Sequence, residues 1–195
     1  MKVLGVAGGI GSGKSVVCQI FRTLGIPVFD SDREAKACYN DLHVQELVSE
    51  TFEVELFPNG QLDREKLASI VFTDKRKLQA LNEIIHPEVA IRFDRWCSRQ
   101  NAPFVIKEAA ILFETGGQEI CTQTALVISP QHLRIARITK RDGLSEGQVR
   151  DRMKNQWSDE DKMKLADFVV TNDKEHALIP QVKNIFNQVI GFTES

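Results

Sequence analysis

A glycine-rich run near the amino end, Gly8 to Ser15, separates a short apolar segment from a segment with helical character. It reads Gly-Gly-Ile-Gly-Ser-Gly-Lys-Ser and fits the spacing G-x-x-x-x-G-K-[ST]. Residues 2–7 before it predict a buried strand, and residues 16–24 after it predict a helix that ends at Gly25. Strand, glycine loop and helix in this order are the context in which the pattern has physical meaning.

The run can bind the phosphates of a nucleoside triphosphate. Its glycines let successive backbone N–H groups turn towards phosphate oxygens, and the helix N-terminus adds partial positive charge. Lys14 supplies a mobile ammonium for the β- and γ-phosphates, and the Ser15 hydroxyl is placed to ligate Mg²⁺. The sequence therefore predicts a nucleoside triphosphate and Mg²⁺ as bound groups. The predicted nucleotide-binding residues of this loop are Gly9, Gly11, Ser12, Gly13, Lys14, Ser15 and Val16.

The composition argues against several other classes of protein. With 195 residues, 42% hydrophobic and 27% charged, the chain is expected to form one domain with small lobes. A net charge of −2 disfavours a general nucleic-acid-binding protein. Four cysteines lie far apart without a C-x-x-C pair, and no apolar run approaches the roughly 20 residues that span a bilayer. A strand that starts at Lys2 leaves no place for a secretory signal. We expect a cytoplasmic monomer with reduced cysteines and no membrane or nucleic-acid partner.

Hydrophobic periodicity and turn residues predict alternating strands and helices over the rest of the chain. The predicted strands cover residues 26–29, 104–106, 124–128 and 167–171. The predicted helices begin at about Arg33, run from Leu42 to Phe52, follow caps at Asp63 and Asp74, begin again at His86-Pro87, and then follow Ser129-Pro130, Ser145, Ser158 and about Lys174. A turn is predicted at residues 58–60. Alternating strands and helices favour an α/β fold, with a central parallel sheet covered by helices on both faces.

The strandless stretch from about residue 33 to residue 100 is too long for a simple crossover, so we expect a helical lobe there. The core is then expected to comprise residues 1–32, 101–130 and 163–195, and residues 131–162 are expected to form a small lid. Seven basic side chains gather in the lid sequence: Arg134, Arg137, Lys140, Arg141, Arg150, Arg152 and Lys154. Arginines there could close over a nucleotide, or they could form a solvated helix face.

Acidic residues follow two of the predicted strands, at the edge of a parallel sheet where ligands bind. Asp30 and Asp32 follow the second strand. A carboxylate there could accept a hydroxyl proton during phosphoryl transfer or help hold Mg²⁺, but both could instead cap the next helix. Glu108 is a second candidate for organising Mg²⁺, with a solvated charge pair to Lys107 as the alternative.

Four further polar or aromatic positions are ambiguous in the sequence. Asn172 after the last strand could touch adenine, or it could form a turn with Asp173. His86 is more readily explained as a helix cap than as a base, because nothing nearby in the sequence orients it. Trp96 and Trp157 lie in helical surroundings and are expected to pack rather than to recognise a ligand.

Together these segments resemble the dephospho-coenzyme A kinases over nearly the whole chain. The segments that carry the resemblance are Gly8 to Ser15, Asp30-Ser31-Asp32 with Ala35, His86-Pro87, Ile111-Leu112-Phe113-Glu114, Arg137 with Arg141-Asp142, Arg152 with Gln156, and Ala166-Asp167 with Asn172-Asp173. The resemblance implies a P-loop nucleotide-kinase fold, a helical lobe that receives the acceptor, and a mobile lid. It implies transfer of the ATP γ-phosphoryl group to the ribose 3′-hydroxyl of dephospho-CoA.

The resemblance also implies individual roles. Asp32 is the implied general base, and the implied phosphate-acting residues are Lys14, Arg137 and Arg141. Asn172 is implied to lie near adenine. The implied acceptor-binding residues are Asp32, His86, Leu112 and Phe113, and the implied metal residues are Ser15 and Glu108. The chain departs from the usual family pattern at Glu108 for Asp, Ala110 for Pro, Arg134 for Gln and Lys174 for Gly. The residues alone leave open a kinase for another small molecule, or an ATP-dependent switch that moves a partner protein.

Overall fold

The structure, a computed structural model, describes residues 1–55, 61–71 and 73–191, so the turn predicted at residues 58–60 lies outside the described residues. The chain divides into two compact units. Residues 1–30 and 100–195 form one, which we call the sheet unit, and residues 31–99 form the other, the helical unit. Within the described residues, no helix has the length and apolar character that crossing a membrane requires.

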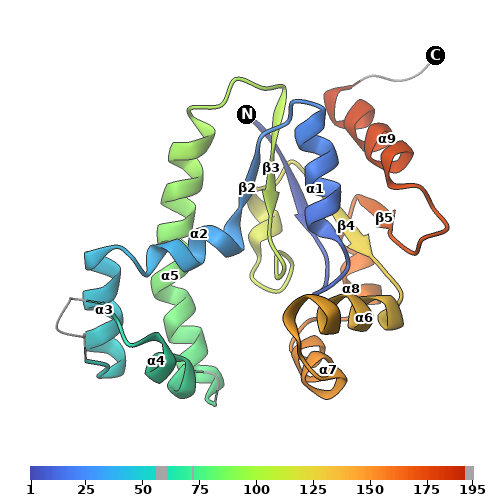
Figure 1. Ribbon diagram of the computed structural model, residues 1–195. Helices are drawn as coiled ribbons and strands as arrows, with labels where there is room; N and C mark the ends of the chain where they lie inside the picture. The colour runs from blue at the N-terminus through green and yellow to red at the C-terminus, as the bar shows by residue number, and fades with distance from the viewer. Residues whose placement is uncertain (56–60, 72, 192–195) are drawn as a thin grey trace. The chain divides into compact units, whose positions relative to one another are not determined.

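The sheet unit is built on five parallel strands in the order β2-β3-β1-β4-β5 (Figure 1). The strands are β1 (Lys2–Ala7), β2 (Val28–Asp30), β3 (Phe104–Glu108), β4 (Gln123–Ile128) and β5 (Phe168–Thr171). β1 lies in the centre, where it pairs with β3 on one side and β4 on the other. The predicted α/β fold with a central parallel sheet is confirmed.

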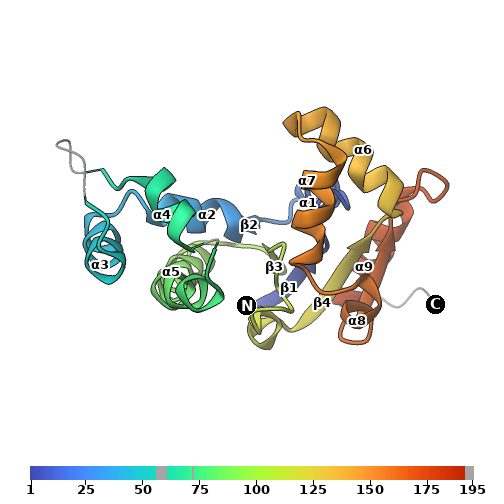
Figure 2. The same ribbon diagram turned by 90° about the horizontal axis from the view of Figure 1, so that it is seen from below.

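Both faces of this sheet are covered. The helices of the sheet unit are α1 (Lys14–Thr23), α6 (Gln131–Asp142), α7 (Glu146–Lys154), α8 (Asp159–Met163) and α9 (Leu178–Ile190). Side chains alternate between the faces along a strand, so Leu4 and Val6 of β1 share a core with residues of α1 and α9. Ala7 belongs to the opposite face, where it packs with Leu112 and Phe113. α6 and α7 pack against each other through a small apolar cluster of their own (Figure 2).

Two element boundaries in the sheet unit differ from the prediction for local reasons. β2 begins two residues later than predicted, after Pro27, which has no N–H; its carbonyl accepts from the Ile106 N–H at 2.9 Å. α9 begins at Leu178 rather than near Lys174. The Asp173 carboxylate binds the N–H groups of the two residues after Lys174, and Lys174 itself has φ 78°. The chain therefore makes a turn before the helix starts.

Among its described residues, the helical unit contains four helices, which are labelled in Figure 1. They are α2 (Ser31–Cys38), α3 (Leu42–Phe52), α4 (Arg64–Val71) and α5 (Lys75–Cys97). The predicted caps are confirmed: the Asp63 carboxylate accepts from the Lys66 N–H at 2.9 Å, and that of Asp74 accepts from the Arg76 N–H at 2.8 Å. α5 packs against each of the other three helices.

The prediction of a helix start at His86-Pro87 was wrong. α5 runs without a break from Lys75 to Cys97 and contains Pro87 in its interior. Buried Leu81, Ile85, Val89 and Phe93 share one face of α5 on both sides of the proline, and this packing holds the helix together across it. Ile91 is 43% exposed because it lies off that face.

Replacing Pro87 with alanine should stabilise the helical unit. Proline costs about 3 kcal/mol relative to alanine inside a helix, because it lacks the N–H and its ring crowds the preceding turn. Pro87 is exposed, so the substitution removes little packing. We expect an unfolding temperature that is higher by several degrees in calorimetry.

The matched control is Ala90→Pro, which places proline at another exposed position of α5 and should lower the unfolding temperature. An unchanged or lower unfolding temperature for Pro87→Ala would show that the native backbone has adapted to the proline.

Candidate functional site

The predicted phosphate loop joins the carboxyl end of β1 to the first turn of α1. Gly13 is the N-cap of α1 and has φ 99°, a left-handed conformation that L side chains rarely adopt. A Cβ atom on Gly13 would lie 2.1 Å from the Asn172 Nδ2 atom. Both the backbone conformation and the available space therefore require glycine at this position.

The carbonyl groups of the loop are bound by side chains from two other segments. Arg134 Nε of α6 donates to the Ile10 carbonyl at 3.0 Å. Arg137 Nη1, one turn later, donates to the Gly11 and Ser12 carbonyls at 3.1 and 3.3 Å. These side chains fix the direction in which three consecutive loop carbonyls point.

The same bonds determine where the loop N–H groups point. In a trans peptide the C=O of one residue and the N–H of the next point in opposite directions. With the Ile10 and Ser12 carbonyls bound by α6, the N–H groups of Gly11 and Gly13 point to the other side of the loop. That geometry makes a nest of backbone donors suited to phosphate oxygens.

Asn172, at the carboxyl end of β5, also binds the loop. Its Nδ2 donates to the Ser12 carbonyl at 2.7 Å, and its own carbonyl accepts from the Ser129 hydroxyl at 2.7 Å. Arg137 Nη2 donates to both oxygens of Asn172 at 3.2 Å. Ser129 thus binds Asn172 rather than capping α6, which starts after Pro130 without a side-chain cap; the predicted Ser129-Pro130 cap was wrong.

The Lys14 ammonium donates to the Gly8 carbonyl at 2.8 Å, across the first turn of the loop. Burial raises the pKa of Glu108 at the end of β3, and the positive charge of Lys14 offsets part of that rise. The structure thus brings the loop lysine and Glu108 together within the sheet unit.

Glu108 and Asp30 are partners in the β3–β2 register, so their carboxyl groups leave the sheet at the same edge. Burial raises the pKa of Glu108, and the neighbouring negative charge of Asp30 raises it further. The Cys18 thiol of α1 donates a hydrogen bond to Glu108, and burial together with this carboxylate raises the pKa of Cys18. Ser15 lies one turn before Cys18 on the same side of α1.

These oxygen atoms fit the chemistry of Mg²⁺. Carboxylate and hydroxyl oxygens are the ligands that Mg²⁺ prefers, and it is usually bound by one or two protein groups plus phosphates. In the part of the chain that the structure describes, no group of three or more His, Cys, Asp or Glu side chains forms a complete metal site. Ser15 and Glu108 would therefore share the ion with the nucleotide.

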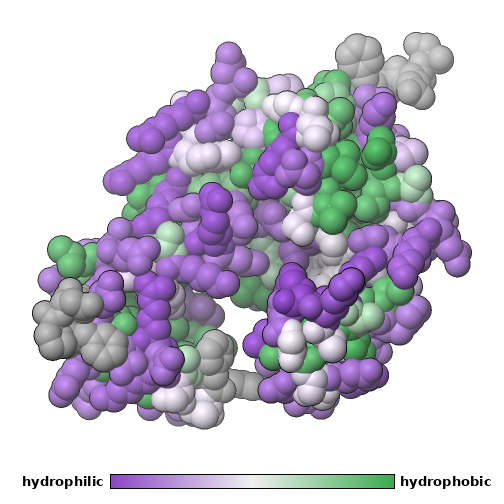
Figure 3. Space-filling view, viewed as in Figure 1, coloured by the Kyte–Doolittle hydropathy of each residue, from purple (hydrophilic) through white to green (hydrophobic). Residues whose placement is uncertain are grey.

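The other predicted residues of the sheet unit have distinct environments. Arg141 pairs with its neighbour Asp142 at 2.7 Å, and its side chain is 66% exposed. It lies on α6, over which hydrophilic side chains gather in the space-filling view (Figure 3). Leu112 and Phe113 are buried in the apolar core beneath the sheet.

Two predicted residues lie in the helical unit. Asp32 is exposed in the first turn of α2, immediately after β2 ends. An acidic side chain is favoured there because the helix N-terminus carries partial positive charge. His86 lies in the middle of α5 and is exposed, so its predicted place as a helix cap was wrong.

Sequence reasoning missed two ion pairs in the sheet unit. Arg134 Nη1 lies 3.1 Å from Asp159 Oδ2. The fully buried Lys162 Nζ lies 2.7 Å from Glu114 Oε1, in the segment after β3. The partners are separated by 25 and 48 residues, and neither pair has a spacing signal in the sequence.

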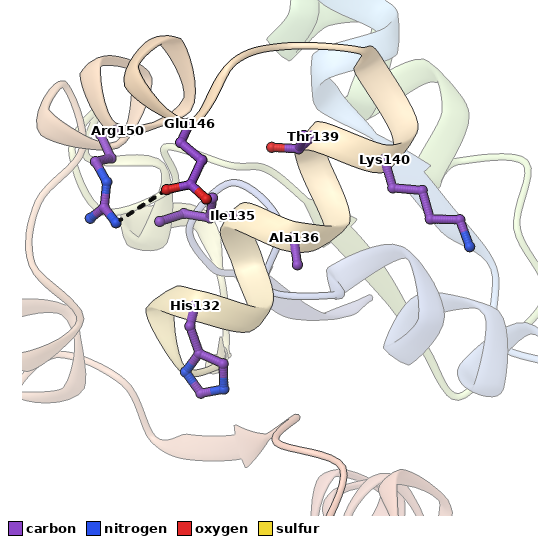
Figure 4. Close-up of a pocket in the computed structure, with 7 residues that line it drawn as sticks. All are labelled: His132, Ile135, Ala136, Thr139, Lys140, Glu146 and Arg150. Atoms are coloured by element: carbon purple, nitrogen blue, oxygen red, sulfur yellow. Dashed lines mark ion pairs between the residues drawn. The ribbon is translucent and has the colours of Figure 1, made fainter.

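A separate hollow of about 330 Å³ lies on α6 and α7 (Figure 4). Its lining residues are His132, Ile135, Ala136, Thr139, Lys140, Glu146 and Arg150. Glu146 and Arg150 form an ion pair at 3.7 Å. Its lining includes none of the predicted site residues, so we assign the candidate site to the loop and its partners.

Comparisons with known proteins agree on one family. A family model described as CoaE, dephospho-CoA kinase, matches residues 2–177. The dephospho-CoA kinase of Porphyromonas gingivalis is 40% identical over 192 residues, which cover 97% of this chain and 95% of that protein. The dephospho-CoA kinase of Thermus thermophilus is 38% identical and covers 90% of this chain and 88% of its own length.

Solved structures agree with these matches. The crystal structure of TT1252 from Thermus thermophilus superposes with a TM-score of 0.85 at 34% identity, covering 100% of this chain and 98% of that one. A dephospho-CoA kinase from Campylobacter jejuni gives a TM-score of 0.68 at 25% identity, with 98% of each chain covered. A shikimate kinase from Acinetobacter baumannii gives 0.56 at 15% identity, with 100% of this chain and 96% of that one covered, a likeness of fold alone.

Gly13→Ala should weaken ATP binding by about tenfold or more, because the methyl group forces both a left-handed alanine and displacement of Asn172. Isothermal titration calorimetry with ATP measures the effect. Gly143→Ala is the matched control: Gly143 has φ 69° at the end of α6, and no atom lies within 4 Å of its Cβ position. Equal weakening by both substitutions would contradict a specific role for Gly13.

Glu108→Gln should raise the stability of the metal-free protein at neutral pH. The folded-state pKa of Glu108 is raised, so its contribution to stability is present at low pH and is lost as the pH rises through that pKa. The variant, which has no charge to bury, should unfold at a higher temperature than the parent near pH 7.5, and the difference should vanish towards about pH 4.

The control for this experiment is Glu119→Gln, which removes an exposed carboxylate of the same unit. A stability difference for Glu108→Gln that does not change with pH would contradict the assigned cause.

Proposed function

The chain belongs to the dephospho-CoA kinase family, and we propose how its own residues carry out the reaction of that family. A dephospho-CoA kinase transfers the γ-phosphoryl group of ATP to the ribose 3′-hydroxyl of dephospho-CoA, the final step of coenzyme A biosynthesis. The observation that carries the proposal is the direction of the Gly11 and Gly13 N–H groups, which the bound carbonyls of Ile10 and Ser12 turn to one side of the loop.

The loop holds the triphosphate. The N–H groups of Gly11 and Gly13 donate to phosphate oxygens, and Lys14 exchanges its bond to the Gly8 carbonyl for the β- and γ-phosphates. The full set of nucleotide-binding residues is Gly9, Gly11, Ser12, Gly13, Lys14, Ser15, Val16 and Asn172. Asn172, at the end of β5, supports the loop through its bond to the Ser12 carbonyl, and we assign it to the adenine side of the nucleotide.

The Ser15 hydroxyl and Glu108 would hold Mg²⁺ together with the nucleotide. When bound, the ion neutralises charge that develops on the β- and γ-phosphate oxygens. Ser15 and Glu108 would hold the ion at the carboxyl edge of the sheet.

Asp32 is the general base. It accepts the proton of the ribose 3′-hydroxyl as the new oxygen–phosphorus bond forms and the bond to the ADP oxygen breaks. Its place in the first turn of α2 supports this role, because the helix N-terminus favours the carboxylate form before the reaction. His86 of the same helical unit and Asp32 contribute to acceptor binding.

Residues 131–162 act as a lid over the nucleotide, and residues 33–100 form the acceptor lobe. Arg137 stabilises the phosphate end of the loop, and Arg141 turns from Asp142 to the transferring group when the lid closes. Burial of Leu112 and Phe113 supports an indirect role for them in acceptor binding. The chain works as a monomer in the cytoplasm.

The decisive experiment is incubation with Mg-ATP and a panel of acceptors: dephospho-CoA, adenosine, a nucleoside monophosphate and shikimate. Mass analysis should find one added phosphate on dephospho-CoA at the ribose 3′ position, with ADP formed in equal amount. A stronger reaction with another acceptor would identify a different small-molecule kinase. ATP hydrolysis that requires a macromolecule, without phosphate transfer, would indicate a switch.

Asp32→Asn should lower kcat by about 100-fold or more, because the asparagine amide cannot accept the 3′-hydroxyl proton. Calorimetric ATP binding should survive, since the loop is unchanged. The control is Glu46→Gln, which removes an exposed carboxylate from α3 of the same helical unit. Full turnover by Asp32→Asn would remove Asp32 from the mechanism.

A further inference from the structure

Arg134 lies against the backbone of the phosphate loop. Only 9% of the residue is exposed, and Nε donates to the Ile10 carbonyl. A Cβ atom on Gly9 would lie 2.0 Å from Arg134 Nη2, so the guanidinium occupies the space that any other side chain at position 9 would take. The Arg134 guanidinium thus places a formal positive charge against the loop backbone at Gly9 and Ile10.

The N–H group, the carbonyl and the side chain of Ile10 all contact residues 131–162, the segment that contains Arg134. Its N–H donates to Gln156 Oε1 at 2.8 Å, while its carbonyl accepts from Arg134. Its side chain packs against the apolar cluster of α6 and α7, which includes Ile138 and Val149. Ile10 therefore anchors the loop to the lid segment, and Arg134 holds the carbonyl that sets the direction of the next N–H group.

Asp159 is the anion that accompanies this buried guanidinium. Its Oδ2 atom lies 3.1 Å from Arg134 Nη1, at the first residue of α8. Burial lowers the pKa of Arg134, and the Asp159 charge acts against this effect. The Ser158 hydroxyl caps the same helix end, so Asp159 is held where its charge is favourable for the helix as well.

We propose that Arg134 is a positioning residue for nucleotide binding, and that Asp159 serves it by neutralising its buried charge. The inference rests on the proposed function, in which the N–H group of Gly11 binds a phosphate. Arg134 holds the Ile10 carbonyl, and so holds that N–H in place before the nucleotide arrives. Its loss should weaken binding of ATP and leave the affinity for the acceptor unchanged.

The length of the arginine side chain allows the two roles of Arg134 to be separated. In glutamine, the amide nitrogen stands at the same place along the chain as Nε of arginine, so Arg134→Gln keeps a donor for the Ile10 carbonyl but loses the charge. In methionine, a methyl group stands there, so Arg134→Met keeps the length and loses the donor. Asp159→Asn removes only the neutralising charge.

Calorimetry with Mg-ATP tests the first role. Arg134→Met should weaken ATP binding by about tenfold, because it leaves a buried carbonyl without a donor, and Arg134→Gln should stay within about threefold of the parent. In steady-state assays the KM for ATP should rise in Arg134→Met while the KM for dephospho-CoA remains unchanged. Equal ATP affinity of the glutamine and methionine variants would overturn the proposal.

The double substitution tests the second role and covers the case in which Arg134→Met does not fold. Asp159→Asn should weaken ATP binding by about threefold to tenfold in the parent and have no effect in the Arg134→Gln background. An equal effect in both backgrounds would overturn the pairing.

The exposed pair in the same segment supplies the control, since Glu146→Gln and Arg150→Gln should leave ATP binding unchanged. If the parent protein binds ATP but does not phosphorylate dephospho-CoA, the proposed function is wrong. The role of Arg134 can still be tested in that case, because comparing the ATP affinities of the variants does not require turnover.

Discussion

The direction of three peptide groups in the loop is the constraint on which the rest of the site depends. A glycine-rich loop has many conformations, and most of them do not present successive N–H groups to one phosphate tail. Here Arg134 and Arg137 bind the Ile10, Gly11 and Ser12 carbonyls, and Asn172 adds a second bond to Ser12. The N–H donors are therefore arranged before a ligand arrives, which reduces the entropy lost on binding.

Residues of α6 and the residue after β5 hold the phosphate loop, although they lie far from it in the sequence. The side chains that hold the loop come from more than 120 residues further along the chain. Parallel topology makes this possible, because β1, β4 and β5 are neighbours and their carboxyl ends share one edge. The loop, the residue after β5 and the helix after β4 therefore meet at the same place.

Local signals were the ones that sequence reasoning could use. The predicted caps at Asp63 and Asp74 are present, and the helix predicted after Ser145 begins there with a capping box between Ser145 and Gln148. All of these contacts join residues only a few positions apart. The helix start predicted at Pro87 was wrong because tertiary packing of α5 outweighs the preference of proline for a helix start. The cap predicted at Ser129 was wrong because the Ser129 hydroxyl donates to the carbonyl of the distant Asn172. The Arg134–Asp159 and Lys162–Glu114 pairs depend on the folded path of the chain, so no spacing rule could predict them. The predicted base, Asp32, and the acceptor-binding residues stay predictions that rest on family membership and on local placement.

The thiol of Cys18 has a chemical consequence of its own. Only a thiolate reacts readily with alkylating agents and peroxides, and the raised pKa of this group keeps it protonated under physiological conditions. A cysteine one turn into the helix that receives the phosphates would ordinarily be activated by the helix N-terminus. Burial among apolar side chains and the carboxylate of Glu108 reverse that tendency, so the protonated thiol is the form favoured beside the phosphate loop.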